Sequence, residues 1–266
     1  MKTAALILFS LLLMGCSDAA TNGSGSPPSV APKHVRGDDV VAEYLRRDAA
    51  PYRKSTVRFT ITADDGSVKT YVMDVSRRQR DEETATFTQI TSPSEDSDLA
   101  SLTIESADRP TVVTTYAASF NEFRETDTNK MFFGGLTAGE LLGEWGKFGY
   151  KLLNQEESNG NPIFRLEGKL KPSSTGLVER TEVAMRGDIY VPEMLQLFDS
   201  SGRRIRTFRV IEVGTDDHGA YAAKTEVENP VYKTKVAIEI LGREFPEKID
   251  DSAFTRERLK SIAARR

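Results

Sequence analysis

The sequence has few of the residues that bind metals or form disulfide bonds. It contains one cysteine, Cys16, and two histidines, His34 and His218. A single thiol cannot form a disulfide within the chain, and two imidazoles alone do not complete a metal site. We therefore expect a fold that a hydrophobic core stabilises, with no metal site.

Signatures of catalysis are also missing. No Gly-x-Ser-x-Gly elbow is present, and the carboxylates lie in turns or at alternating strand positions, where solvated side chains are usual. His218 lies in Asp216-Asp217-His218-Gly219, which is typical of a hairpin turn. The tripeptide Arg186-Gly187-Asp188 is likewise interpreted as a turn rather than as an adhesion motif. We predict no catalytic residues, no cofactor and no enzymatic activity.

Long hydrophobic runs and an excess of positive charge are absent as well. The apolar run at residues 4–14 is interrupted only by Ser10 and is shorter than the roughly 20 residues that a membrane-spanning helix needs. With Lys2 before it, this run is typical of a signal peptide. The chain carries 36 Lys and Arg against 40 Asp and Glu, and this mild acidity argues against a nucleic-acid partner.

The signal peptide ends in Leu13-Met14-Gly15-Cys16, which resembles the lipobox of bacterial lipoproteins. In that family the cysteine receives a diacylglyceryl group, the preceding peptide is cleaved and the new N-terminus is acylated. The resemblance implies that residues 1–15 are removed and that acyl chains such as palmitate on Cys16 anchor the protein to a membrane. Ser17 after the cysteine favours the outer membrane. The alternative is an ordinary signal peptide with an incidental cysteine.

The rest of the chain divides into a tether and a folded domain. Residues 16–36 hold the lipidated cysteine and a flexible tether rich in Gly, Ser and Pro. Residues 37–266 form the domain, which begins with an amphipathic helix at residues 38–48. The apolar residues of this helix share one face: Val40, Val41, Tyr44 and Leu45.

Short segments that alternate polar and apolar residues follow, separated by turn residues such as Asp64-Asp65-Gly66. About a dozen such segments indicate a mainly β domain with an antiparallel sheet. The predicted strands lie at residues 56–63, 68–75, 84–91, 99–105, 111–118, 150–156, 163–170, 178–185, 189–198, 204–213, 220–227 and 232–241. Of the basic residues, Arg203, Arg204 and Arg206 are expected on the surface of a strand.

The densest apolar stretch of the domain lies at residues 131–145. Within it, Thr137 and Glu140 form a capping box, which predicts a short helix from Ala138.

Several motifs, in this order, resemble the LolA/LolB-like family of periplasmic lipoprotein carriers, their outer-membrane receptors and related lipid-binding lipoproteins. They are Phe123-Arg124-Glu125, Phe133-Gly134-Gly135, Thr137-Ala138-Gly139-Glu140-Leu141, the strand and turn at residues 192–203, and the closing loop and helix at residues 249–262. The resemblance implies a curved antiparallel sheet, an incompletely closed β-barrel, with helices covering the concave face. It also implies a cavity without charges inside, which suits acyl chains.

Six residues are candidates for binding the hydrophobic ligand: Phe132, Phe133, Leu141, Leu142, Trp145 and Phe148. Core packing explains these side chains equally well, since helices that cover a sheet bury the same residue types.

The sequence thus favours a non-enzymatic lipoprotein of the bacterial cell envelope, anchored through Cys16 and facing the periplasm. Its function is to bind or transfer a hydrophobic ligand, either a lipid or the acyl chain of a lipoprotein. The alternative is an interaction or sensor scaffold that binds an envelope protein partner with the same sheet. A filled interior and an exposed apolar patch would favour the scaffold.

Overall fold

The computed structural model describes residues 35–47, 49–106, 109–158 and 160–264. The predicted signal peptide, the lipidated Cys16 and all but the end of the tether lie outside the described residues and stay predictions. No helix in the described part of the chain is long and apolar enough to cross a membrane.

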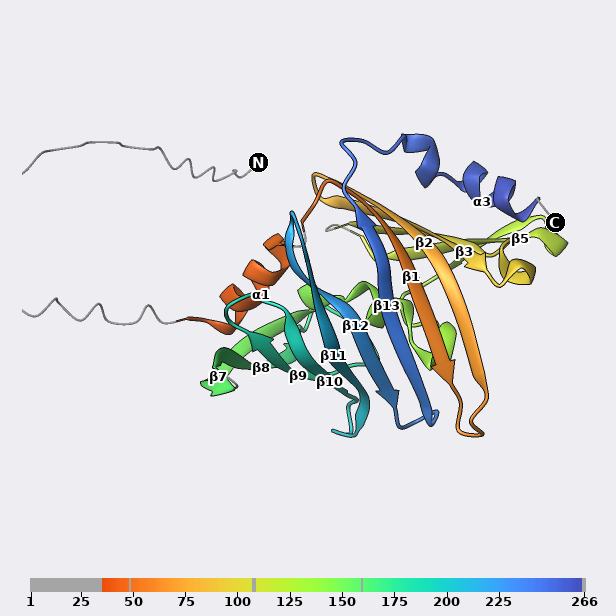
Figure 1. The fold of residues 1–266 in the computed structure, drawn as a ribbon. Coiled ribbons are helices and arrows are strands. Elements are labelled where there is room, and N and C mark those ends of the chain that lie inside the picture. The colour runs from red at the N-terminus through yellow and green to blue at the C-terminus, as the bar shows by residue number, and fades with distance from the viewer. Residues whose placement is uncertain (1–34, 48, 107–108, 159, 265–266) are drawn as a thin grey trace, which may run out of the picture. The chain divides into compact units, whose positions relative to one another are not determined.

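One antiparallel sheet of thirteen strands dominates the fold, which is mainly β as predicted (Figure 1). Its strands are β1 (Tyr52–Thr62), β2 (Val68–Arg80), β3 (Glu83–Ser92), β4 (Ala100–Ser106), β5 (Val112–Ala117), β6 (Glu122–Thr126), β7 (Phe148–Ser158), β8 (Asn161–Leu170), β9 (Arg180–Arg186), β10 (Pro192–Phe198), β11 (Arg204–Asp216), β12 (Gly219–Asn229) and β13 (Thr234–Glu244). The order is β6-β5-β4-β3-β2-β1-β13-β12-β11-β10-β9-β8-β7. The edge strands β6 and β7 do not pair, so the sheet is an incompletely closed barrel.

The two faces of the sheet follow from the alternation of side chains along each strand. Val57, Phe59 and Ile61 of β1 point to one face, because side chains two residues apart lie on the same side. Phe59 pairs with Tyr71 of β2 and with Ile238 of β13. We call this side the inner face; it is the concave side of the curved sheet (Figure 1). The opposite side is the outer face.

The helix predicted at residues 38–48 is α1 (Gly37–Arg47), and it packs on the inner face near β7. Val40 and Val41 are buried and pack with Leu166 and Val183. Asp38 fixes the start of the helix to the sheet edge, because its carboxylate accepts a hydrogen bond from the backbone N–H of Tyr150 at 2.7 Å.

The C-terminal segment packs on the outer face, at the other half of the sheet. It comprises the 3₁₀ turn η5 (Asp251–Phe254) and α3 (Arg256–Ala263), which confirms the predicted closing helix. Leu259 and Ile262 of α3 are buried against Phe87 of β3 and Leu102 of β4. Both faces of the sheet therefore carry a helix.

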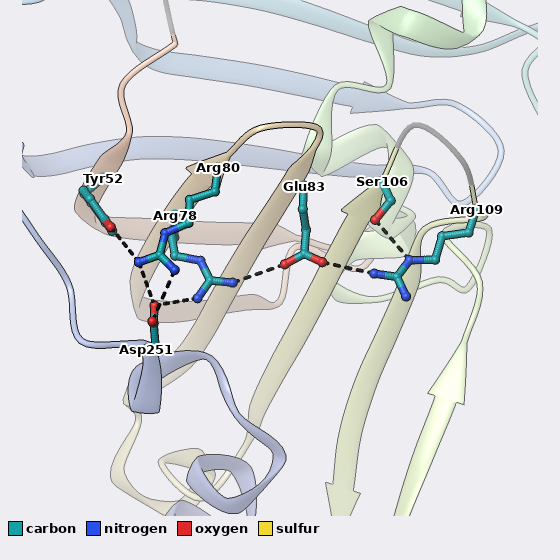
Figure 2. Close-up of polar contacts among 7 residues, drawn as sticks. All are labelled: Tyr52, Arg78, Arg80, Glu83, Ser106, Arg109 and Asp251. Atoms are coloured by element: carbon teal, nitrogen blue, oxygen red, sulfur yellow. Dashed lines mark hydrogen bonds and ion pairs between the residues drawn. The ribbon is translucent and has the colours of Figure 1, made fainter.

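A row of ion pairs joins this segment to the hairpin of β2 and β3 (Figure 2). Arg78 donates a hydrogen bond to Asp251 at 2.7 Å and another to Glu83 at 3.1 Å. Glu83 accepts in turn from Arg109 at 3.0 Å, and Arg80 pairs with Asp251 at 3.1 Å. Most of these side chains are exposed, so the row orients the segment more than it stabilises it.

Candidate functional site

Residues 127–147 join β6 to β7 and cross the inner face of the sheet (Figure 1). We call this segment the cover. It contains η3 (Phe133–Gly135), α2 (Ala138–Leu142) and η4 (Trp145–Lys147). Leu136, between η3 and α2, is fully buried and packs with Phe59, Val227 and Val236 of the sheet. The cover is therefore part of the core of the inner face.

Two glycines let the cover lie directly on β12 and β13. Gly134 and Gly135 have positive φ angles of 62° and 75°, which residues other than glycine rarely adopt. A Cβ atom on Gly134 would lie 2.5 Å from Cγ2 of Val236. The carbonyl of Gly134 accepts hydrogen bonds from the Oγ1 atom of Thr234 at 2.8 Å and from Nδ2 of Asn229 at 3.3 Å.

The predicted capping box at the start of α2 is present. Thr137 accepts a hydrogen bond from the backbone N–H of Glu140 at 3.1 Å, and the Glu140 carboxylate accepts one from the backbone N–H of Thr137 at 2.7 Å. Both donors would otherwise lack a partner within the helix. The capping box therefore fixes the Glu140 carboxylate in place.

Arg206 of β11 is the centre of a buried polar cluster beneath the cover. Its Nη1 atom donates to Oδ1 of Asn229 at 2.9 Å and to the carbonyl of Ile205 at 2.6 Å. Its Nη2 atom donates to the carbonyl of Gly135, and its Nε atom lies 3.3 Å from Oε1 of Glu140. The side chains of Arg206 and Glu140 are 4% and 5% exposed. One guanidinium thus holds both η3 and α2 to the sheet.

Burial makes the two charges of this cluster interdependent. It raises the pKa of Glu140, an effect that the charge of Arg206 opposes. It also lowers the pKa of Arg206, and the carboxylate of Glu140 opposes that shift. Each partner therefore favours the charged form of the other, and loss of either leaves an uncompensated charge in the core.

The predicted absence of charge inside the sheet is wrong. Besides Arg206 and Glu140, Arg77 and Glu105 lie at inner-face positions of β2 and β4 by the register of the strands. Burial raises the pKa of Glu105, and the charge of Arg77 partly offsets this rise. The inner face therefore combines apolar patches with paired charges.

A cavity of about 70 Å³ lies between the cover and strands β7 to β10. Its apolar lining includes Trp145, Phe148, Tyr150, Leu177, Leu195 and Leu197, and its polar lining includes Glu140, Glu144 and Lys147. A buried water occupies about 10–15 Å³ in this measure, so a few waters fit. Ligand pockets usually measure about 300–1,000 Å³. With the cover in place, the cavity is too small for an acyl chain.

The structure brings two of the six predicted ligand-binding residues to the cavity. Trp145 and Phe148 line it, whereas Phe132, Leu141 and Leu142 are not among its lining residues. Leu141, in the last turn of α2, is 37% exposed. The side chain of Phe133 lies outside the described part of the chain. A role of these residues in ligand binding stays a prediction.

Arg206 was expected on the surface, and that prediction is wrong. Basic residues are usual on strand surfaces, but Arg206 lies two residues before Phe208, which packs in the core of the inner face. Because side chains two residues apart share a face, this spacing was the available signal of burial. Asn229 carried no comparable signal, since Asn-Pro usually marks a turn.

His218 lies in a turn between β11 and β12, as expected from its neighbours. Its backbone N–H donates to Oδ1 of Asp216 at 2.9 Å, and its ring stacks on Phe245 with centroids 3.7 Å apart. Among the described residues, no group of three His, Cys, Asp or Glu side chains is placed to hold a metal ion.

Three solved structures share this fold. A DUF1329 family protein from Desulfovibrio piger superposes with a TM-score of 0.77 at 15% identity and covers 83% of this chain and 96% of its own. A putative outer membrane lipoprotein-sorting protein domain from Vibrio parahaemolyticus superposes with a TM-score of 0.76 at 15% identity and covers 84% of this chain and 98% of its own. A LolA superfamily protein from Nitrosomonas europaea superposes with a TM-score of 0.70 at 13% identity and covers 84% of this chain and 99% of its own. At such identities the comparison shows the fold alone.

Comparison of the sequence with protein-family models assigns the chain to a family. No curated protein matches the chain. A family model described as "Uncharacterized protein" matches residues 82–261, which is more than half of the chain. The protein therefore belongs to the family of that model, and its folded domain is a LolA-like incompletely closed barrel.

Proposed function

We propose that the protein binds a hydrophobic ligand, a lipid or the acyl chain of a lipoprotein, against the inner face beneath the cover. It acts without catalysis, as a lipoprotein of the bacterial cell envelope anchored through Cys16, with the outer membrane favoured. The observation that carries this proposal is the cover itself. One buried leucine and one polar cluster hold a short segment over the apolar strand residues of a LolA-like fold.

The energies of opening and of binding are of similar size. Exposing Leu136 costs about 1.5–3 kcal/mol, and separating a buried ion pair without replacing it costs about 3–5 kcal/mol. Each buried methylene of an acyl chain contributes about 0.8 kcal/mol, so a chain of about fourteen methylenes contributes about 11 kcal/mol. Binding of such a chain therefore offsets the loss of these two contacts of the cover.

Two leucines offer a matched test. Leu177 lines the cavity and is 50% exposed, whereas Leu153 on the edge strand β7 is 54% exposed and is not in the lining. A glutamate at either position is tolerated by the fold, but a charge at the cavity opposes an apolar ligand. We expect Leu177→Glu to weaken at least about tenfold the fatty-acid binding that changes Trp145 fluorescence, while Leu153→Glu leaves that binding unchanged.

The measurement combines fatty-acid titration of the full chain with native mass spectrometry of protein purified from bacterial envelopes. Trp145, the single tryptophan, lies on the cover and reports its displacement. Absence of any co-purified lipid together with no uptake of the probe would exclude the proposal. A Cys16→Ala variant separates location from binding, because it should bind the probe in solution but lose membrane attachment.

A second candidate function is the interaction scaffold, and the small size of the cavity favours it. A scaffold needs no opening of the cover. In that case fatty acids leave Trp145 fluorescence unchanged. A variant whose cover cannot open then captures an envelope protein partner as well as the wild-type protein does.

A further inference from the structure

A larger hollow lies on the outer face of β8 to β11, away from the cover. We call it the outer groove. Its volume is about 450 Å³, which falls within the usual range of ligand sites. The strand register places Arg165, Ala184, Met194 and Arg209 side by side across the four strands. A chain neighbour of each one packs in the core of the inner face, so these four residues point outward. These neighbours are Phe164, Val183, Leu195 and Phe208.

Irregular strand pairing shapes the outer groove. β10 shifts against β9 between Pro192 and Met194, and β11 shifts against β12 on both sides of Glu212. Such bulges bend a strand, re-aim its side chains and are frequent beside binding sites. Ile211 and Val213 lie at the second irregularity, and they line the groove while 49% and 38% exposed. With Met194 they form an apolar strip.

Three arginines also line the outer groove, and they differ in their partners. Arg165 donates to Glu156 at 2.7 Å, and Arg186 donates to Asp188 at 3.0 Å. The guanidinium of Arg209 makes no hydrogen bond or ion pair with any residue that the structure describes, and it is exposed. A free guanidinium beside exposed apolar side chains can contact a ligand that has both an anionic and an apolar part.

We propose that the outer groove binds a single-chain amphiphile with a carboxylate or phosphate head group. Arg209 pairs with the head group through two parallel N–H donors, which suits both anions. The strip of Met194, Ile211 and Val213 contacts the tail. Glu193 is the one carboxylate among the described lining residues, and it opposes the head group. This site lies on the face opposite to the cover and is independent of the ligand proposed there.

The test compares probes that share a tail or a head. Isothermal titration calorimetry measures binding of four probes to the full chain: dodecanoate, dodecyl phosphate, dodecyltrimethylammonium and inorganic phosphate. Each amphiphile is kept below its critical micelle concentration. The variants are Arg209→Gln and Glu193→Gln, with Lys224→Gln as the control. Lys224 is a partly exposed cation of neighbouring β12 that does not line the groove. A photoactivatable dodecanoate then maps the labelled peptide.

We expect both anionic amphiphiles to bind, with Arg209→Gln weakening each about tenfold. Glu193→Gln should tighten binding, and Lys224→Gln should leave it unchanged. Label on residues 192–213 supports the proposal, and a difference between the two anions identifies the preferred head group. Equal binding of the ammonium amphiphile, no effect of Arg209→Gln, or label confined to the cover would overturn it. Binding to anionic vesicles but to no dissolved amphiphile would also overturn it, in favour of a membrane surface.

Discussion

Replacing Arg206 with methionine tests whether the buried polar cluster holds the cover. Methionine fills a similar volume but can neither donate nor carry charge. The carboxylate of Glu140 therefore loses its ion-pair partner, and the carbonyl of Gly135 and Oδ1 of Asn229 each lose a donor. Breaking a buried pair by removing one partner costs about 3–5 kcal/mol. For a domain of this size, each kcal/mol lowers Tm by about 2–4 °C, so a decrease of roughly 6–20 °C is expected.

The loss of stability in Arg206→Met should depend on pH. Burial already raises the pKa of Glu140 above its ordinary value, and removing the charge of Arg206 raises that pKa further. A carboxyl whose pKa is raised in the folded state contributes stability that is complete below its unfolded pKa and is lost as pH rises through the folded pKa. The deficit of Arg206→Met relative to wild type should therefore be smallest in mild acid and should grow toward neutral pH. Arg206→Met combined with Glu140→Gln should lose most of this pH dependence.

Urea unfolding at several pH values measures these differences, and Trp145 fluorescence reports the cover directly. The control is Arg58→Met, which breaks the Arg58–Glu239 pair at 2.8 Å. The side chains of Arg58 and Glu239 are 42% and 33% exposed, so a loss of stability of at most about 1 kcal/mol is expected. If Arg206→Met unfolded within about 1 kcal/mol of wild type at neutral pH, with native Trp145 fluorescence, the cluster would not hold the cover.

Gly134→Ala tests the inner face, with Gly66→Ala as its control, and Leu259→Ala tests the outer face. Gly134→Ala combines a positive φ of 62° with a Cβ atom 2.5 Å from Val236, so a loss of about 1–3 kcal/mol is expected in urea unfolding. Gly66→Ala, at φ 79° with nothing within 4 Å, shows the effect of φ alone, and an equal loss would contradict the close contact. Leu259→Ala on the outer face should cost about 2–5 kcal/mol without changing the native fluorescence of Trp145; altered fluorescence would show that the faces are coupled.

Local patterns predicted the elements of the fold well, because local interactions determine them. The alternation that predicted a strand at residues 56–63 is present as an inner-face row of Val57, Phe59 and Ile61. The spacing of Thr137 and Glu140 is present as a capping box. Neither feature depends on where the rest of the chain lies. The C-terminal helix was predicted from the family resemblance instead; in the structure it is α3, whose apolar residues Leu259 and Ile262 repeat at helical spacing.

The site could be predicted only in part, because it depends on contacts between distant segments. The burial of Arg206 is set by Gly135 and Glu140 of the cover, some seventy residues earlier in the chain. Strand alternation indicates a face, but it does not show whether another segment will lie on that face. The outer groove depends on shifts of register such as that at Glu212, which composition and period do not show.

Arg206 and Arg209 show why two arginines on one strand differ in function. They are an odd number of residues apart on β11, so their side chains leave opposite faces of the sheet. Arg206 is 4% exposed, and acceptors from the cover and the sheet surround it. Arg209 is exposed and meets no acceptor among the described residues.

This contrast allows each arginine to be tested with the other as its control. Arg206→Met should lower stability and loosen the cover while leaving dodecanoate bound at the outer groove. Arg209→Gln should release dodecanoate from the outer groove while leaving the unfolding midpoint unchanged. If both variants changed both properties, the two faces would form a single coupled site, and the independence argued from the register of β11 would be wrong.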